Sequence, residues 1–271
     1  MVRSAAATSL PAMIKPALKA MLLVLWIAVF FLPVLALHRL QRIAFRDRLV
    51  RLCHGGILAI VGLRVCVVGG ISPQRPLLLV SNHLSYLDVP VLAAHMPVCF
   101  TPKAEIGRWP VIGEICRMTG CIFITRSSSA LEEASQTMSE ALAGGRVVCL
   151  YPEATTGNGM ETLPFRSSFF AMAEKPVGGA ALMVQPVAIC YRTLRGLPID
   201  RTQWPEIAWY GDMELLPHLW NLLKLGHMYV DLVFLESVTM AQFADRKAMA
   251  EHCRSVIARA LHSPESCLPQ R

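Results

Sequence analysis

A run of apolar residues near the N-terminus places the strongest constraint on how this chain can fold. Residues 18–37, LKAMLLVLWIAVFFLPVLAL, carry a single charge, that of Lys19. About twenty such residues cover the roughly 30 Å hydrocarbon core of a bilayer. The alternatives are a cleaved signal peptide, which has a shorter apolar region and a small-residue cleavage site, and an apolar core helix. We predict a membrane anchor, and Pro33 leaves open whether it crosses the bilayer or lies within one leaflet.

Basic residues follow the apolar run directly. Residues 39–51 contain five arginines, more than the cationic residues upstream of the run. An excess of arginine and lysine marks the cytoplasmic side of a membrane segment, so we expect an inner-membrane protein whose larger, downstream part faces the cytoplasm. The spacing of Arg39, Arg42 and Arg46 predicts one helical face that contacts anionic headgroups.

Overall composition supports a membrane partner over nucleic acid. The net charge is +7, and the mean hydropathy is +0.45. A basic charge alone suits both partners, but a chain this apolar, with its arginines beside the anchor and no nucleic-acid motif, favours lipid. The nine cysteines are odd in number and form no C-x-x-C pair. We therefore expect neither a disulfide framework nor a zinc site, and a reducing compartment.

After residue 63 short apolar runs alternate with helical patterns, and several runs are apolar at consecutive positions, as in strands covered on both faces. This alternation predicts an α/β fold with a mixed, largely parallel sheet flanked by helices. We expect an anchor and basic helix in residues 1–63, a catalytic domain in 64–262 and a tail in 263–271. The expected strands are 64–68, 76–80, 97–101, 121–125, 146–151, 183–189, 206–211 and 228–235, and the expected helices are 110–118, 129–143, 167–175, 213–224 and 241–261.

The stretch LLLVSNHLSYLDVPVL, residues 77–92, places His83 and Asp88 five positions apart at the end of an expected strand. A neutral imidazole can take a hydroxyl proton as a general base, and a carboxylate on its other nitrogen fixes the tautomer. No G-x-S-x-G sequence is present, so the expected nucleophile is a hydroxyl of the substrate. For an isolated pair, a structural histidine at a strand end would be the better interpretation.

Two further polar residues also follow apolar strands. Arg126 ends GCIFITR, residues 120–126, and Glu153 lies in LYPEATTGNG, residues 150–159. Loops at strand ends gather the active sites of α/β sheets. This repeated arrangement favours a functional interpretation of the pair at His83. His218 and His227, which have no evident partner in the sequence, are expected to be structural.

With these motifs in order, the chain resembles the glycerolipid acyltransferases related to 1-acylglycerol-3-phosphate acyltransferase. NHLSYLD is similar to their first motif, GCIFITR to the second, YPEATT to the third and VQPVAI, residues 184–189, to the fourth, and KAEIGRWPVIG, residues 103–113, resembles the segment between the first two. The resemblance implies transfer of an acyl group from acyl-CoA or acyl-carrier protein to a lysolipid hydroxyl at a membrane. It also implies His83 and Asp88 as the catalytic pair, with no metal and no other cofactor.

The same resemblance assigns acceptor binding to Arg126 and to residues of the third motif and beyond it, namely Glu153, Thr155, Thr156 and Arg166. Two positions depart from the family pattern. Ala154 replaces a glycine, which would strain the backbone if φ is positive there. Thr156 replaces an arginine that would pair with a phosphate.

These departures leave the acceptor open. Arg166 could replace the missing arginine for 1-acylglycerol-3-phosphate. The region TTGNG to LPFRSS also resembles acyltransferases that complete ornithine lipids, whose acceptor has a zwitterionic headgroup. A third alternative is a catalytically inactive membrane protein that binds lipid.

Overall fold

The computed structural model describes residues 10–124 and 128–263. Within them a seven-stranded sheet has the order β1-β7-β5-β2-β4-β3, and the short β6 pairs with β5. The strands are β1 Leu63–Val68, β2 Leu77–Ser81, β3 Cys99–Phe100, β4 Val148–Leu150, β5 Met183–Leu194, β6 Leu197–Pro198 and β7 Met228–Phe234. The α-helices are α1 Leu10–Arg39, α2 Ile43–Val61, α3 Asp88–Ala93, α4 Ile112–Thr119, α5 Ser128–Ala143, α6 Trp204–Ile207, α7 Leu215–Lys224 and α8 Arg246–His262, and the 3-10 helices are η1 Ala104–Arg108, η2 Ser167–Glu174 and η3 Met240–Gln242.

The sheet is mixed and largely parallel, which confirms the predicted fold class. β2 is parallel to both its neighbours, β5 and β4, and β3 continues the parallel set beside β4. β7 runs antiparallel to β5 and parallel to β1. The carboxyl ends of β2 and β4 therefore lie at the same edge of the sheet.

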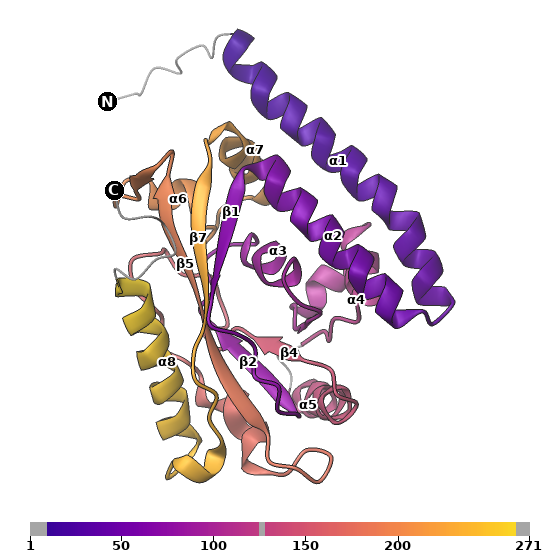
Figure 1. Cartoon of the computed structure of the whole chain (residues 1–271), viewed down its shortest axis with the longest axis vertical. Helices are drawn as coiled ribbons and strands as arrows, with labels where there is room; N and C mark the ends of the chain where they lie inside the picture. The colour runs from indigo at the N-terminus through magenta and orange to yellow at the C-terminus, as the bar shows by residue number, and fades with distance from the viewer. Residues whose placement is uncertain (1–9, 125–127, 264–271) are drawn as a thin grey trace.

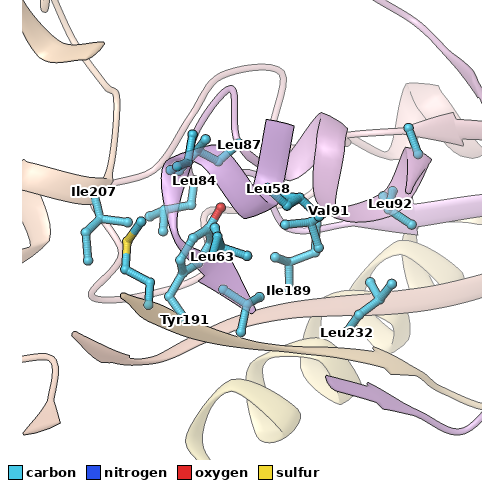
Figure 2. Packing of buried hydrophobic residues seen from close by; sticks show 14 of the residues in the cluster. Leu58, Leu63, Leu84, Leu87, Val91, Leu92, Ile189, Tyr191, Ile207 and Leu232 are labelled. Carbon is cyan, nitrogen blue, oxygen red and sulfur yellow. The ribbon is translucent and has the colours of Figure 1, made fainter. Parts of the chain in front are cut away.

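Strand β2 shows why its residues are apolar at consecutive positions. All five of its residues are buried. Leu77 and Leu79 pack in a cluster with α2, α3 and α7, whereas Leu78 and Val80 pack in a second cluster with α5, η2 and α8. Successive side chains of a strand point to opposite faces, and helices cover both faces here (Figure 1). Figure 2 shows part of the first cluster, including Leu58 of α2 and Val91 of α3.

Two expected strands are absent from the described residues. Residues 206–211 were expected to form a strand, but Trp204–Ile207 form the short helix α6, with a proline in its first turn. Proline suits this position because its φ is already helical and its missing N–H would have no partner there. In 121–125 the described residues make only an isolated bridge between Lys103 and Ile124.

Helices α1 and α2 form an antiparallel hairpin at the periphery of the sheet domain (Figure 1). The ammonium of Lys19 donates to the carbonyl of Val61 at 2.6 Å, and the indole of Trp26 donates to the carbonyl of Cys53 at 2.9 Å. The single charge in the apolar run therefore binds the C-terminus of α2, where carbonyls lack helical partners and the helix dipole favours a cation.

One face of α1 packs against the protein and the rest is exposed and apolar. Leu23, Phe30 and Val34 are buried. The exposed large apolar residues of α1 are Met13, Ile14, Leu18, Met21, Leu22, Val24, Leu25, Val29 and Leu32. The helical segment Met13–Arg39 contains an 18-residue window with a mean hydropathy of 2.8 and is long enough to cross a membrane. An exposed apolar surface of this kind marks a candidate membrane anchor.

The predicted shared face of three arginines is wrong. Arg39 ends α1, Arg42 precedes α2, and Arg46 lies within α2. The chain turns between the two helices, so helical spacing does not carry across this segment. Arg46 is also buried and pairs with Asp47 at 2.7 Å, which removes it from any headgroup surface.

The cysteine prediction is wrong at one position. Cys66 is disulfide-bonded. The other described cysteines are free: Cys53, Cys99, Cys116, Cys121, Cys149, Cys190 and Cys253. An odd number of cysteines excludes complete pairing but is compatible with a single disulfide bond.

The α1–α2 contact can be tested with two neighbouring glycines of α2. A Cβ at Gly56 would clash with the indole of Trp26, whereas a Cβ at Gly55 would meet nothing within 4 Å. We expect Gly55→Ala to stabilise the protein by up to ~1 kcal/mol through helix propensity. Gly56→Ala should destabilise it by ~1–3 kcal/mol because the indole must move. Thermal unfolding in detergent measures both, and equal midpoints would show that the indole does not constrain the hairpin.

Candidate active site

The loop after β2 is tied to β5 by Asn82. Its side-chain amide donates to the carbonyl of Ile189 at 3.1 Å, and its side-chain oxygen accepts the N–H of the same residue at 2.9 Å. The Asn82 side chain thus takes the place of a backbone partner. The pairing between this segment and β5 therefore continues one residue beyond the end of β2. The position of the next residue, His83, is set by this contact.

Asp88 is fully buried at the start of α3, and its carboxylate accepts four hydrogen bonds. Its Oδ2 accepts from Nδ1 of His83 at 2.8 Å and from the backbone N–H groups of Leu84 and Ser85 at 2.7 and 3.0 Å. Its Oδ1 accepts from the hydroxyl of Tyr191 at 2.8 Å. A buried carboxylate needs such partners. With Nδ1 engaged, the imidazole presents Nε2 for proton transfer.

Two tyrosines hold this pair in place. The ring of Tyr151 stacks on the ring of His83, with 3.9 Å between centroids and 15° between planes. Burial raises the pKa of Tyr191 well above its ordinary value, so its hydroxyl stays protonated and donates to Asp88. The stacked ring of Tyr151 limits the rotation of the imidazole, and the hydroxyl of Tyr191 holds the carboxylate that orients it.

The loop after β4 binds both backbone groups of His83. The carboxylate of Glu153 accepts the N–H of His83 at 3.3 Å, and the carbonyl of His83 accepts the N–H of Gly157 at 2.8 Å. Glu153 is buried, and burial raises the pKa of its carboxyl to about 8. The loops carrying the first and third motifs are therefore one structural unit.

Ala154 has φ 59°, in the left-handed region. The strain expected at this departure from the glycine of the family pattern is therefore present, because a Cβ crowds the following carbonyl in this conformation. Its backbone N–H donates to the carbonyl of Tyr151 at 3.0 Å, which closes the turn that carries Glu153.

A cavity of about 380 Å³ opens beside the histidine. Residues from the loops after β2 and β4, from β5 and from the segment before α6 line it. They include His83, Glu153, Glu161, Tyr191, Arg201 and Trp204. The pair at the sheet edge thus faces a space in which a substrate hydroxyl can reach the imidazole.

The structure gathers only some of the predicted site residues at this cavity. His83 and Glu153 line it, and Asp88 lies directly behind His83. Thr155 and Arg166 are exposed, Thr156 is partly exposed, and none of the three lines the cavity. Arg126 lies outside the described residues. Substrate binding by these four residues stays a prediction.

The cavity also holds residues that the sequence did not single out. Arg201 comes from the segment between β6 and α6, Trp204 begins α6, and Glu161 follows the third motif. Gly159, with φ +84°, lies against the indole of Trp204 where a Cβ would clash. The glycines of TTGNG were the one available signal, because close backbone approach needs a residue without a side chain.

His218 has two polar partners, although none was evident in the sequence. It is buried, its Nδ1 lies 3.0 Å from the hydroxyl of Tyr86, and its Nε2 lies 3.1 Å from the carbonyl of Ala208. The N–H of the adjacent Trp209 donates to the carbonyl of Leu84 at 3.0 Å. Among the described residues, no group of three or more His, Cys, Asp or Glu side chains could hold a metal ion.

A histidine paired with a buried carboxylate beside a cavity at the sheet edge is an arrangement that can act as a general base. Comparison with known proteins narrows the class. Residues 64–190 match the model of the family described as Acyltransferase. The chain is 34% identical over 224 residues to the lyso-ornithine lipid O-acyltransferase of Brucella abortus, which covers 81% of this chain and 84% of the relative.

A second relative is similar in sequence, and one solved structure is similar in fold. The chain is 31% identical to the 1-acyl-sn-glycerol-3-phosphate acyltransferase of Neisseria meningitidis, over 79% of this chain and 82% of the relative. The crystal structure of the 1-acyl-sn-glycerophosphate (LPA) acyltransferase PlsC from Thermotoga maritima superposes with a TM-score of 0.68 at 18% identity, covering 94% of this chain and 100% of that one. The chain therefore belongs to the Acyltransferase family, and it is an acyltransferase.

The strain at Ala154 predicts a stabilising substitution. Ala154→Gly should raise the free energy of unfolding by ~1 kcal/mol, because glycine adopts positive φ without a Cβ clash. Ala248→Gly, in the exposed first turn of α8, is the control and should lower stability through the loss of helix propensity. Denaturant unfolding monitored by circular dichroism measures both. A destabilised Ala154→Gly variant would contradict the strain.

Burial of Glu153 predicts a pH dependence of stability. The pKa of its carboxyl is about 8 in the folded state, against an ordinary value of 4.5, so the folded protein binds the proton more tightly than the unfolded chain. The resulting stabilisation is fully present below about pH 4.5 and is lost as pH rises through 8. The unfolding temperature of the wild type should therefore fall more steeply between pH 5 and 9 than that of Glu153→Gln. Parallel slopes would contradict the shift.

Proposed function

We propose that the chain transfers a fatty acyl group from an acyl thioester to the hydroxyl of a lysolipid, with a lyso-ornithine lipid as the acceptor. The observation that carries the choice of acceptor is the cavity beside His83, which is lined by Arg201 together with Glu161. A phosphate monoester favours a site rich in guanidinium groups, whereas this mixed lining suits a headgroup with both charges. The relatives from Brucella abortus and Pseudomonas aeruginosa, named lyso-ornithine lipid O-acyltransferases, support the same choice.

In the proposed mechanism Nε2 of His83 takes the proton of the acceptor hydroxyl as its oxygen attacks the thioester carbonyl. Asp88 accepts the hydrogen bond from Nδ1 and stabilises the imidazolium that forms. Collapse of the tetrahedral intermediate forms the new ester and breaks the bond to sulfur. The thiolate leaves and takes the proton back from the imidazolium, which returns the histidine to its starting state.

The donor and the membrane complete the proposal. The donor is acyl-CoA or acyl-carrier protein. The N-terminal segment, residues 1–63, contains the α1–α2 hairpin and anchors the chain in the inner membrane. The acyltransferase domain, residues 64–262, lies on the cytoplasmic side. The exposed apolar face of α1 supports this anchoring. Because one stripe of α1 packs on the protein, we infer that the hairpin lies along the surface of the membrane.

A second candidate acceptor is 1-acylglycerol-3-phosphate. The relative from Neisseria meningitidis supports it, and Arg126 and Arg166 would then bind the phosphate. The third alternative, an inactive lipid-binding protein, is disfavoured because His83 and Asp88 are joined in the geometry of a working pair. Nucleic acid is not proposed as a partner.

The first experiment offers the full-length protein a labelled acyl thioester with lyso-ornithine lipid or 1-acylglycerol-3-phosphate in mixed micelles. We expect acylation of the lyso-ornithine lipid. His83→Ala should lower turnover at least ~100-fold through the loss of the general base. Asp88→Asn should lower it by up to ~10⁴-fold, the effect of a wrong imidazole tautomer in serine proteases.

His252→Gln is the matched control. The side chain of His252, in α8, packs on Phe243 and does not line the cavity. Substantial turnover by His83→Ala would exclude the assigned base. Acylation of 1-acylglycerol-3-phosphate alone would replace the proposed acceptor with the second candidate.

A further inference from the structure

The TTGNG segment, residues 155–159, and the segment 201–204 meet at one wall of the cavity. Gly159 lies against the indole of Trp204, and the guanidinium of Arg201 lies 3.7 Å from the sulfur of Met160. The absence of a side chain at Gly159 thus lets the two segments pack directly against each other at the wall of the cavity.

This wall carries opposite charges whose side chains are open to solvent. Arg201 and Glu161 are both exposed and both line the cavity. Among the described residues, Arg201 is the one lysine or arginine of the lining, and neither side chain belongs to any of the ion pairs. Burial raises the pKa of the neighbouring Glu153 to about 8, so the carboxyl of Glu153 is largely protonated at neutral pH.

We propose that Arg201 and Glu161 form the subsite that selects a zwitterionic acceptor headgroup, with Arg201 binding its carboxylate and Glu161 its ammonium group. This inference rests on the proposed function and names the residues that set its specificity. A guanidinium presents paired donors that match a carboxylate, and an ammonium group pairs with a carboxylate in the same charge-assisted manner. The headgroup of a lyso-ornithine lipid has one free carboxylate and one free amine, so each end has a partner.

Trp204 and His83 place the subsite relative to the chemistry. Trp204 is partly buried and lines the same wall as Arg201, while His83 lines the cavity at the end of β2. A headgroup held at Arg201 and Glu161 would occupy the cavity and bring the acceptor hydroxyl toward the imidazole. Both residues would then act in binding the acceptor rather than in the proton transfer itself.

The test measures KM and kcat of the full-length protein in mixed micelles with a fixed acyl thioester. The acceptors are lyso-ornithine lipid, its carboxyl methyl ester, its derivative acetylated on the side-chain amine, and 1-acylglycerol-3-phosphate. Arg201→Gln should raise KM for lyso-ornithine lipid ~10- to 100-fold, the effect of one lost charged hydrogen-bonding partner, with kcat within about twofold. It should leave KM for the methyl ester unchanged, because that acceptor has no carboxylate to lose.

Glu161→Gln should behave in the mirror-image way. It should raise KM for lyso-ornithine lipid and leave KM for the amine-acetylated derivative unchanged. Arg201→Lys, which keeps the charge but loses the paired donors, should give an intermediate KM. Arg246→Gln is the matched control, because this partly exposed arginine pairs with Glu174 and does not line the cavity. Its KM values should equal those of the wild type.

The outcomes separate the subsite from the proposed function. If the wild type acylates lyso-ornithine lipid but Arg201→Gln changes KM for the native acceptor and the methyl ester equally, or changes neither, the subsite is overturned and the acceptor stands. If the wild type acylates only 1-acylglycerol-3-phosphate, the acceptor and the subsite both fail. Because both side chains are exposed, unchanged circular dichroism and unfolding temperature are expected for each variant.

Discussion

The carboxylate of Asp88 is removed from water completely, and four donors surround it. A buried charge without partners would destabilise the fold by several kcal/mol, so the chain around it must keep the conformation that supplies them. Two donors come from the loop itself, one from His83 and one from Tyr191 on β5. The same contacts that satisfy the charge therefore fix the loop after β2, join it to the neighbouring strand and orient the imidazole.

The second constraint acts on the backbone of His83. Its N–H and carbonyl both pair with the loop after β4, through Glu153 and Gly157, and its side chain stacks on Tyr151. The backbone and the ring of the histidine are thus held by the segment that follows β4, on one side of β2. A histidine held this way would need little reorganisation to act as the proposed base, which is how positioning contributes to rate. The strained backbone at Ala154 belongs to this loop, as strained residues often do in active sites.

Most of the sheet and the central pair could be predicted from local patterns. Runs such as 77–81 are apolar at every position because both faces of the strand are covered, and a five-residue spacing placed His83 near Asp88. Predictions from local patterns were wrong where another local rule or a contact between distant residues determined the structure. Pro205 begins a helix in a segment that resembles a strand, and the turn between α1 and α2 separates arginines that a single helix would align. The disulfide at Cys66 depends on chain proximity, which spacing does not encode.

The sequence by itself determined the fold class, the apolar N-terminal helix, the pairing of His83 with Asp88 and membership in a family of acyltransferases, because these follow from periodicity and from residues close together in the chain. Only the tertiary structure decided which charged side chains line the cavity. Arg201 lies 118 positions after His83, and Glu161 lies in a different loop from either. Arg201, Glu161 and His83 line the same cavity because β5 and β4 flank β2 in the sheet. No pattern along the chain predicts that strand order. Strand order follows from how apolar surfaces that are distant in the sequence pack together. The residues that line the cavity are therefore determined by the tertiary structure.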